Sequence, residues 1–174
     1  FWGSYVGGII TIAGVLLTIR YYTKQEQEKE NHNLKHNLKL SYWHLKFQID
    51  KITEFYSHII LISAEFVPED IIFTKDDYNY YFDKLAYLDK LFAPDKIERL
   101  ELYYRSLLDL ESARVKCHRN KAMSEGIINS DDFEWFKFKL TYAYNLEKEN
   151  GLYLGFTPVP CNISEILEDL REYT

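Results

Sequence analysis

The hydrophobic pattern of the chain changes abruptly after residue 19. Residues 1–19 carry no charged side chain, and a helix of that length extends roughly 28 Å, close to the ~30 Å hydrocarbon core of a bilayer. Aromatic residues lie at both ends of this run, and Arg20 and Lys24 follow it, which is typical of a membrane-spanning helix. A signal peptide would place its basic residues before the apolar run. We therefore expect a transmembrane helix over residues 1–22, with a buried helix of a soluble domain as the alternative.

Small residues form one stripe along this apolar segment. Their spacings of three and four residues place them on one helix face, and the stripe consists of Gly3, Gly7, Thr11, Gly14 and Thr18. Small residues let helices approach closely in lipid, so the stripe predicts that the spans self-associate, although Gly and Thr are also common in such helices. No ionisable residue interrupts the run, which argues against a proton relay or a transporter. A ring of such spans, lined by Gly and Thr, is a physically allowed pore.

Beyond a polar stretch, apolar positions recur at spacings of four and three residues, with Ser41 filling one gap. They are Leu34, Leu38, Leu45, Ile49, Ile52, Tyr56 and Ile59. This pattern predicts a helix that continues to about Phe66, where Val67-Pro68 ends it. It fits a stalk that pairs neighbouring chains as well as an ordinary amphipathic helix that packs on its own domain.

The rest of the chain predicts further helices. Thr74 is typical of an N-cap, Ala93-Pro94 separates two helices, and Gly126 ends the second of them. The segment after Ser130 has conflicting patterns, because its caps favour a helix and its period of two favours a strand. Asn162 opens a short final helix.

These elements predict a mainly α protein. For the segment near 136–156, a small β-hairpin is the alternative. The expected domains are a transmembrane helix at 1–22, a stalk or long helix at 23–66, and a cytoplasmic helical domain at 67–174. The lysine and arginine residues that follow the apolar run place the C-terminal domain in the cytoplasm by the positive-inside rule.

The composition of the chain excludes several classes of protein and of binding site. Hydrophobic residues make up 47% of the chain, which excludes a disordered protein, and a net charge of −6 argues against a general nucleic-acid coat, so no DNA partner is expected. Two cysteines cannot form a disulfide framework or a four-cysteine zinc site. His32 and His36 have metal-ligand spacing but no evident third ligand. The common nucleotide-binding and hydrolase motifs are absent, so we expect no metal, no cofactor and, on balance, no enzyme.

One helix face combines core and basic residues. The apolar stripe of residues 100–117 runs through Arg114, and His118 lies four residues further on the same side. The surrounding segment is the most basic in the chain and contains Arg114, Lys116, His118, Arg119 and Lys121. Such a cluster can bind a phosphate, with Lys116 and Lys121 as the candidate ligands. Alternatively, cations collect at a helix C-terminus and Arg114 pairs with a core carboxylate.

The segment also resembles the active-site motif of helical HEPN ribonucleases, in which an arginine is followed by a histidine a few residues later. Arg114 and His118 form one such pair with three intervening residues, where the family has four to six. Arg119-Asn120 begins a second copy, in which Ser124 stands at the histidine position. The resemblance implies Arg114, His118, Arg119 and Asn120 as candidate catalytic residues acting on RNA.

A transmembrane helix followed by a helical HEPN-like domain is similar to the small membrane accessory proteins of type VI-B CRISPR loci. That resemblance implies a homo-oligomeric pore in a bacterial inner membrane, with an antiviral role and with RNA or a CRISPR effector as a partner. We therefore expect an oligomeric single-pass membrane effector that depolarises the membrane. A membrane-anchored HEPN-like ribonuclease and a non-conducting scaffold for a cytoplasmic partner are the alternatives.

Overall fold

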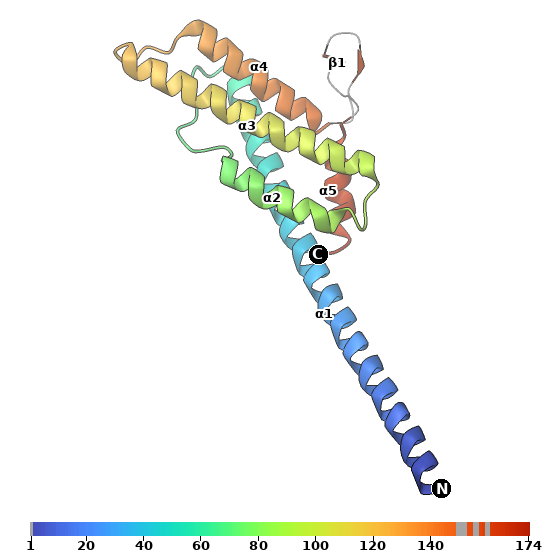
Figure 1. Ribbon diagram of the computed structural model, residues 1–174. Coiled ribbons are helices and arrows are strands. Elements are labelled where there is room, and N and C mark those ends of the chain that lie inside the picture. The colour runs from blue at the N-terminus through green and yellow to red at the C-terminus, as the bar shows by residue number, and fades with distance from the viewer. Residues whose placement is uncertain (1, 149–152, 155–156, 159–160) are drawn as a thin grey trace. The chain divides into compact units, whose positions relative to one another are not determined.

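The computed structural model describes the backbone of residues 2–148, 153–154, 157–158 and 161–174, and the side chains of residues 14–84, 87–148 and 161–174. The protein is mainly helical, as the sequence predicts (Figure 1). The elements are α1 (Trp2–Tyr56), the π-helical turn η1 (Ser57–Leu61), α2 (Lys75–Leu88), α3 (Pro94–Met123), α4 (Ser130–Leu146), β1 (Tyr153–Leu154), β2 (Thr157–Pro158) and α5 (Ile163–Arg171).

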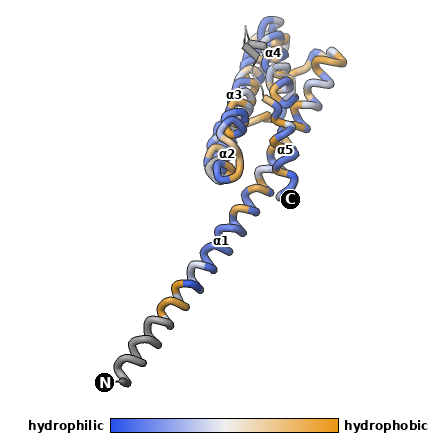
Figure 2. Tube along the Cα trace, turned by 90° about the vertical axis from the view of Figure 1, so that its right-hand side faces the viewer, coloured by the Kyte–Doolittle hydropathy of each residue, from blue (hydrophilic) through white to orange (hydrophobic). Residues whose placement is uncertain are grey.

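The chain divides into two units, residues 1–37 and residues 38–174. In the first unit, the described side chains of α1 form an apolar stretch that is followed by a polar one (Figure 2). Within the part of the chain whose side chains are described, no helical stretch is both long and apolar enough to cross a bilayer. Residues 1–13 of the predicted span lie outside the described side chains.

The second unit is a helical bundle built around α3. This helix lies along α4 and also contacts α2 and α5 (Figure 1). Buried apolar side chains from α1, α3 and α4 form the core, and its largest members include Leu45, Ile52, Tyr103, Leu107, Leu110, Phe136 and Leu140. The buried face of α1 within this unit repeats at three and four residues, which is the period that the sequence shows.

Local capping chemistry fixes most helix starts. The Thr74 hydroxyl accepts a hydrogen bond from the Asp77 backbone N–H, and the Asp77 carboxylate accepts one from the Thr74 backbone N–H. These reciprocal bonds satisfy two N–H groups at the start of α2. Asn162 caps α5 through the Glu165 N–H, as predicted. For α4 the cap is Asn129, one residue before the expected Ser130.

One predicted alternative and one predicted boundary differ from the structure. Residues 130–146 form a helix, so the strand alternative for this segment is wrong, and the only β-pairing among the described residues joins the two-residue strands β1 and β2. The first long helix ends earlier than the predicted Phe66. Its last turn widens into η1, where the Ile62 N–H donates to the Ser57 carbonyl, and Ser63 then adopts a left-handed conformation with φ of 58°. A residue in that conformation cannot continue a right-handed helix.

Candidate functional site

Arg114 and His118, the pair singled out in the sequence, lie together and hold one loop. The Arg114 guanidinium donates two hydrogen bonds to the Glu111 carboxylate, at 2.9 and 2.7 Å. Its Nη1 also donates to the carbonyl oxygens of Pro68 and Glu69, at 3.2 and 2.8 Å. Nε2 of His118 lies 2.8 Å from the same Pro68 carbonyl. Because a carbonyl only accepts hydrogen bonds, Nε2 carries the proton in this arrangement.

Glu111 also binds this loop directly. Its Oε2 also accepts a hydrogen bond from the Ile72 backbone N–H, at 2.9 Å. The carboxylate therefore joins the guanidinium to the far end of the loop, and its hydrogen bonds raise the pKa of Arg114 further. Arg114 is buried, and its charge is balanced by Glu111 rather than by solvent. The geometry gives this arginine a structural task, which is to fix residues 68–72 against α3.

The other basic residues of the segment lie on different surfaces. Lys116 pairs with Asp132 of α4 at 2.8 Å, and Asn120 donates to the same carboxylate at 2.6 Å. These hydrogen bonds hold the pKa of Asp132 below its usual value. Arg119 is exposed. The proposed phosphate ligands Lys116 and Lys121 are therefore not gathered at one point, since Lys121 lines two cavities on another side of α3 that do not include Lys116.

The larger of these cavities has a volume of about 600 Å³. One side is formed by η1 and the residues that follow it, including Ile59, Ser63 and Glu65, and the other side by the α3–α4 turn and neighbouring helix residues, including Lys121 and Ile127. The smaller cavity, of about 360 Å³, shares Glu65 and Lys121 with the larger one and also reaches His118. The linings of the two cavities contain hydrophobic, acidic and basic side chains.

Unusual backbone conformations gather at the larger cavity. Ser63 and Gly126, both in its lining, have positive φ values of 58° and 89°, and Glu125 beside them has φ of 53°. The π-helical η1 contributes Ile59 and Ile60. Such conformations cost free energy and are frequent at functional sites. No sequence pattern indicated this site, because it depends on the approach of segments that lie about sixty residues apart.

A second feature absent from the sequence analysis is the buried carboxyl of Glu147. Its Oε1 accepts a 2.6 Å hydrogen bond from the Tyr103 hydroxyl, and its Oε2 has no hydrogen-bond partner within the described part of the chain. Burial raises the pKa of Glu147 to about 8, although the bond from Tyr103 opposes this shift. The backbone carbonyl of Glu147 accepts two hydrogen bonds from Ser164 and so ties α4 to α5.

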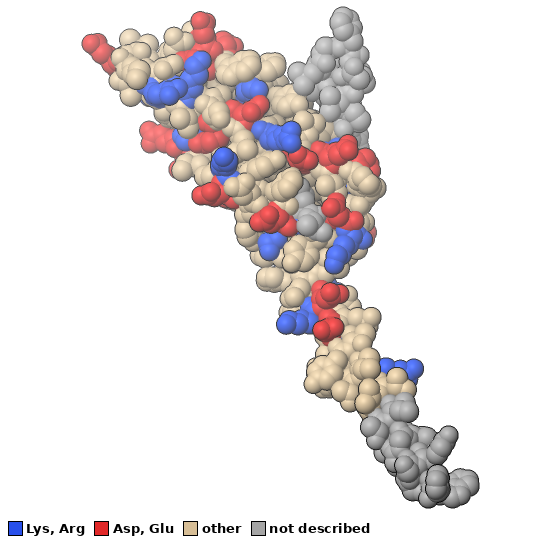
Figure 3. All heavy atoms as spheres, viewed as in Figure 1, with Lys and Arg blue, Asp and Glu red and all other residues tan. Residues whose placement is uncertain are grey.

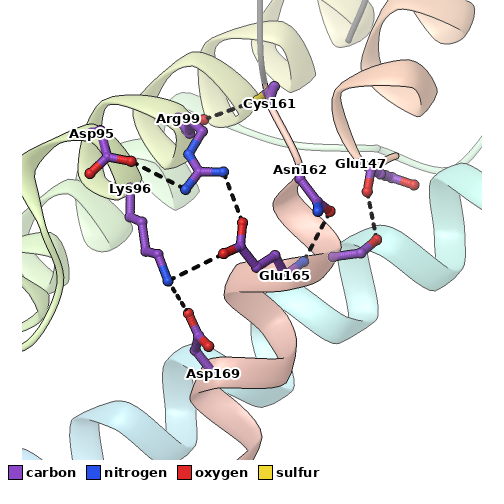
Figure 4. Close-up of polar contacts among 9 residues, drawn as sticks. Asp95, Lys96, Arg99, Glu147, Cys161, Asn162, Glu165 and Asp169 are labelled. Atoms are coloured by element: carbon purple, nitrogen blue, oxygen red, sulfur yellow. Dashed lines mark hydrogen bonds and ion pairs between the residues drawn. The ribbon is translucent and has the colours of Figure 1, made fainter. Parts of the chain in front are cut away.

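Ion pairs also fasten α5 to the start of α3 (Figure 4). Lys96 bonds to Asp169 and lies 3.6 Å from Glu165, which also pairs with Arg99 at 3.2 Å. Cys161 lies beside Arg99 and is buried, which raises the pKa of its thiol to about 12. A thiol with that pKa stays protonated and unreactive at neutral pH. This group of residues therefore positions α5 and offers no nucleophile.

The small-residue stripe is described only in part. Gly3, Gly7 and Thr11 lie outside the residues whose side chains are described. At Gly14, a Cβ atom would meet no other atom within 4 Å, and Thr18 donates its hydroxyl to the Gly14 carbonyl at 2.8 Å. The backbone at Gly14 is thus open to contact from outside the chain. Metal ligands do not cluster anywhere in the described part of the chain.

No family model, no curated protein and no solved structure matches this chain.

Proposed function

We propose that this protein is a single-pass membrane effector whose chains assemble through the helix and the domain to depolarise a bacterial inner membrane. The observation that carries the proposal is the exposure of successive large apolar side chains of α1 directly before its polar stretch. Val15, Leu16, Leu17 and Ile19 are all exposed, and successive helix residues point in different directions. Large apolar side chains that are exposed on several sides of one helical turn belong in a hydrophobic environment.

The residues that follow support the same placement. Tyr21 and Tyr22 are exposed directly after the apolar stretch, next to Arg20, where an aromatic belt and a basic flank are expected at a membrane surface. Together with the uncharged residues 1–13, this stretch has the length of a bilayer span. The residues after Lys24 would then lie on the cytoplasmic side.

A pore is the simplest activity for such an assembly. The open backbone at Gly14 permits close packing of neighbouring spans. A ring without charged groups discriminates little between small ions, because nothing in it replaces their hydration or selects their sign. The antiviral role, and RNA or a CRISPR effector as partner, belong to this proposal through the family resemblance.

The test is expression in bacteria that carry a potential-sensitive dye. We expect the wild-type chain to enter the membrane fraction and to collapse the membrane potential. Leu17→Lys, which places a charge in the span, should abolish both effects, whereas the matched control Leu17→Ala should retain them. A chain that is found in the membrane fraction but leaves the potential unchanged would rule out the pore.

The scaffold alternative has one observation in its favour. Within residues 38–174, α1 carries a second apolar face that lies opposite its buried one. Leu40, Trp43 and Phe47 recur at three and four residues and remain exposed. If the potential is unaffected, a cytoplasmic partner held on this face becomes the better explanation. Binding of such a partner would weaken on Trp43→Ala, since a large aromatic side chain contributes most to an interface.

A further inference from the structure

Two short segments flank the larger cavity, and each carries exposed apolar side chains. The first wall is residues 59–65 and carries Leu61 and Ile62, whereas the second wall is residues 121–127 and carries Met123 and Ile127. These four side chains are between 68% and 78% exposed, which is more than almost any other large apolar residue described in the chain. Single exposed apolar residues are ordinary, but several beside a concave surface mark a contact site.

The two walls also carry opposite charges. Glu65 lies on the first wall and Lys121 on the second, and both line the larger and the smaller cavity. Within the described residues, neither side chain has a hydrogen-bond or ion-pair partner. The neighbouring Lys137 differs, because Glu134 already neutralises it at 2.5 Å. Each wall therefore offers two apolar side chains and one available charge of opposite sign to that of the other wall.

We propose that this cavity face docks a second copy of the same chain about a two-fold axis. In a two-fold contact, residue i of one copy meets residue j of the other, and j meets i in return. The first wall of each copy would then face the second wall of its neighbour. Glu65 would pair with the neighbour's Lys121 twice, and Leu61 and Ile62 would cover Met123 and Ile127. The proposal names the contact surface for the self-association in the proposed function and rests on that function.

A second copy fits the charges better than other occupants. An anionic ligand would meet Glu65 and Glu134, whereas a cationic ligand would meet Lys121 and Lys137. Basic and acidic side chains are also interspersed over the domain in the view of Figure 3, so that face has no surface of one sign to attract an oppositely charged partner. A second copy of the chain supplies both signs at once. Each contact pairs one Glu65 with one Lys121, so the contact itself adds no repulsion between the two acidic chains.

The size of the contact suits molecules that share a membrane. Burying four such side chains removes on the order of 300 Å² of apolar surface per copy, which is less than a stable soluble dimer needs. Confinement to a bilayer raises the local concentration and makes a weak contact effective. The surface therefore works where the chains are tethered side by side.

Cross-linking of the full chain in phospholipid vesicles tests this surface. Ile62→Cys is placed in one chain and Ile127→Cys in a second, and the mixture is treated with a short bismaleimide. The native Cys117 and Cys161 are buried, so the introduced thiols react. We expect this mixture to form a cross-linked dimer, whereas a mixture of Ile62→Cys with the exposed control Ser112→Cys should not. An equal yield from both mixtures would overturn the proposal.

Charge reversal separates a specific contact from a damaged fold. Lys121→Glu in both cysteine chains should lower the dimer yield several-fold, and so should Glu65→Lys in both. When one chain carries Lys121→Glu and the other Glu65→Lys, every pair has opposite signs again and the yield should recover. Yields that ignore these changes, or that fail to recover in the mixed case, would contradict the two-fold contact.

Ion release from the same vesicles decides the proposed function separately. If dimers form in a charge-dependent way but no ions are released, the contact surface is supported and the pore is contradicted. If ions are released but no charge-dependent dimers form, the pore is supported and this contact surface is contradicted.

Discussion

The Tyr103 hydroxyl donates a 2.6 Å hydrogen bond to Glu147, and both side chains are completely buried. Glu147 follows the last residue of α4, so this bond joins the end of α4 to the middle of α3. The second carboxyl oxygen has no hydrogen-bond partner among the described residues, and burial is the main reason that the pKa of Glu147 rises to about 8. At neutral pH this carboxyl is therefore largely protonated in the folded protein.

This raised pKa predicts that the domain becomes less stable as the pH increases. In the unfolded chain Glu147 loses its proton near pH 4.5, whereas the folded protein retains it until about pH 8. Between these values the folded state binds more protons, so the free energy of unfolding falls by up to about 1.4 kcal/mol per pH unit. Glu147→Gln cannot ionise and should remove this part of the pH dependence. Urea denaturation at several pH values between 5 and 8 measures the slope.

Tyr103→Phe provides the control for that experiment. It removes the hydroxyl that donates to Oε1 of Glu147 and should destabilise the domain by about 1–3 kcal/mol. Because the bond from Tyr103 lowers the pKa of Glu147, its loss should extend the pH-dependent fall to higher pH. An identical slope in the wild type and in Glu147→Gln would show that the buried carboxyl does not titrate as expected.

The turn after α3 predicts a pair of opposite stability changes. Glu125 has a positive φ of 53° although it carries a Cβ, and its side chain is exposed. Glu125→Gly should relieve this strain and stabilise the protein by about 0.5 kcal/mol, a net value because glycine also loosens the unfolded chain. Gly126→Ala should cost about 1 kcal/mol, because φ at that position is 89° even though the added Cβ would touch nothing. Thermal melts of both variants test the pair, and equal signs would contradict it.

The small-residue stripe predicts a change in oligomer mass. Gly7→Leu combined with Gly14→Leu should hold neighbouring spans apart and lower the mass of the assembly in detergent. Leu16→Ala and Leu17→Ala, which alter the same helix outside the stripe, serve as controls and should leave the mass unchanged. An assembly that is unaffected by the glycine changes would place the main interface within residues 38–174.

The sequence predicts features of this protein that depend on near neighbours in the chain. The caps at Thr74 and Asn162 are local hydrogen bonds, and helix periodicity places Arg114 and His118 on one face before any tertiary contact is known. Glu111, the carboxylate that pairs with Arg114, lies only three residues away on the same helix. The sequence does not show that the carbonyls of Pro68 and Glu69 also bind Arg114, because they arrive from a distant loop. For the same reason it indicated neither the Glu147 carboxyl nor the cavity, which form only when α3 meets segments far away in the chain.

Substitutions at Arg114 and His118 distinguish a structural role of these residues from a catalytic one. Arg114→Ala leaves the partly buried Glu111 without its cation and frees the loop carbonyls, so it should cost about 2–4 kcal/mol. Arg114→Lys should recover only part of this loss, because an ammonium cannot reproduce the two parallel bonds of a guanidinium. His118→Ala should cost about 1 kcal/mol or less, since the Pro68 carbonyl retains its bond from Arg114. Thermal and urea denaturation of the three variants measures these differences.

A ribonuclease would show the opposite pattern. Its histidine transfers protons and its arginine stabilises charge on the phosphate, so His118→Ala would abolish cleavage while the fold survives. In the structure Nε2 of His118 and Nη1 of Arg114 are bound to the Pro68 carbonyl, and both would have to leave it to meet a phosphate. We therefore expect purified full-length protein to leave single-stranded RNA intact. Cleavage that disappears in a well-folded His118→Ala variant, but persists in a Lys116→Ala control, would establish an enzyme instead.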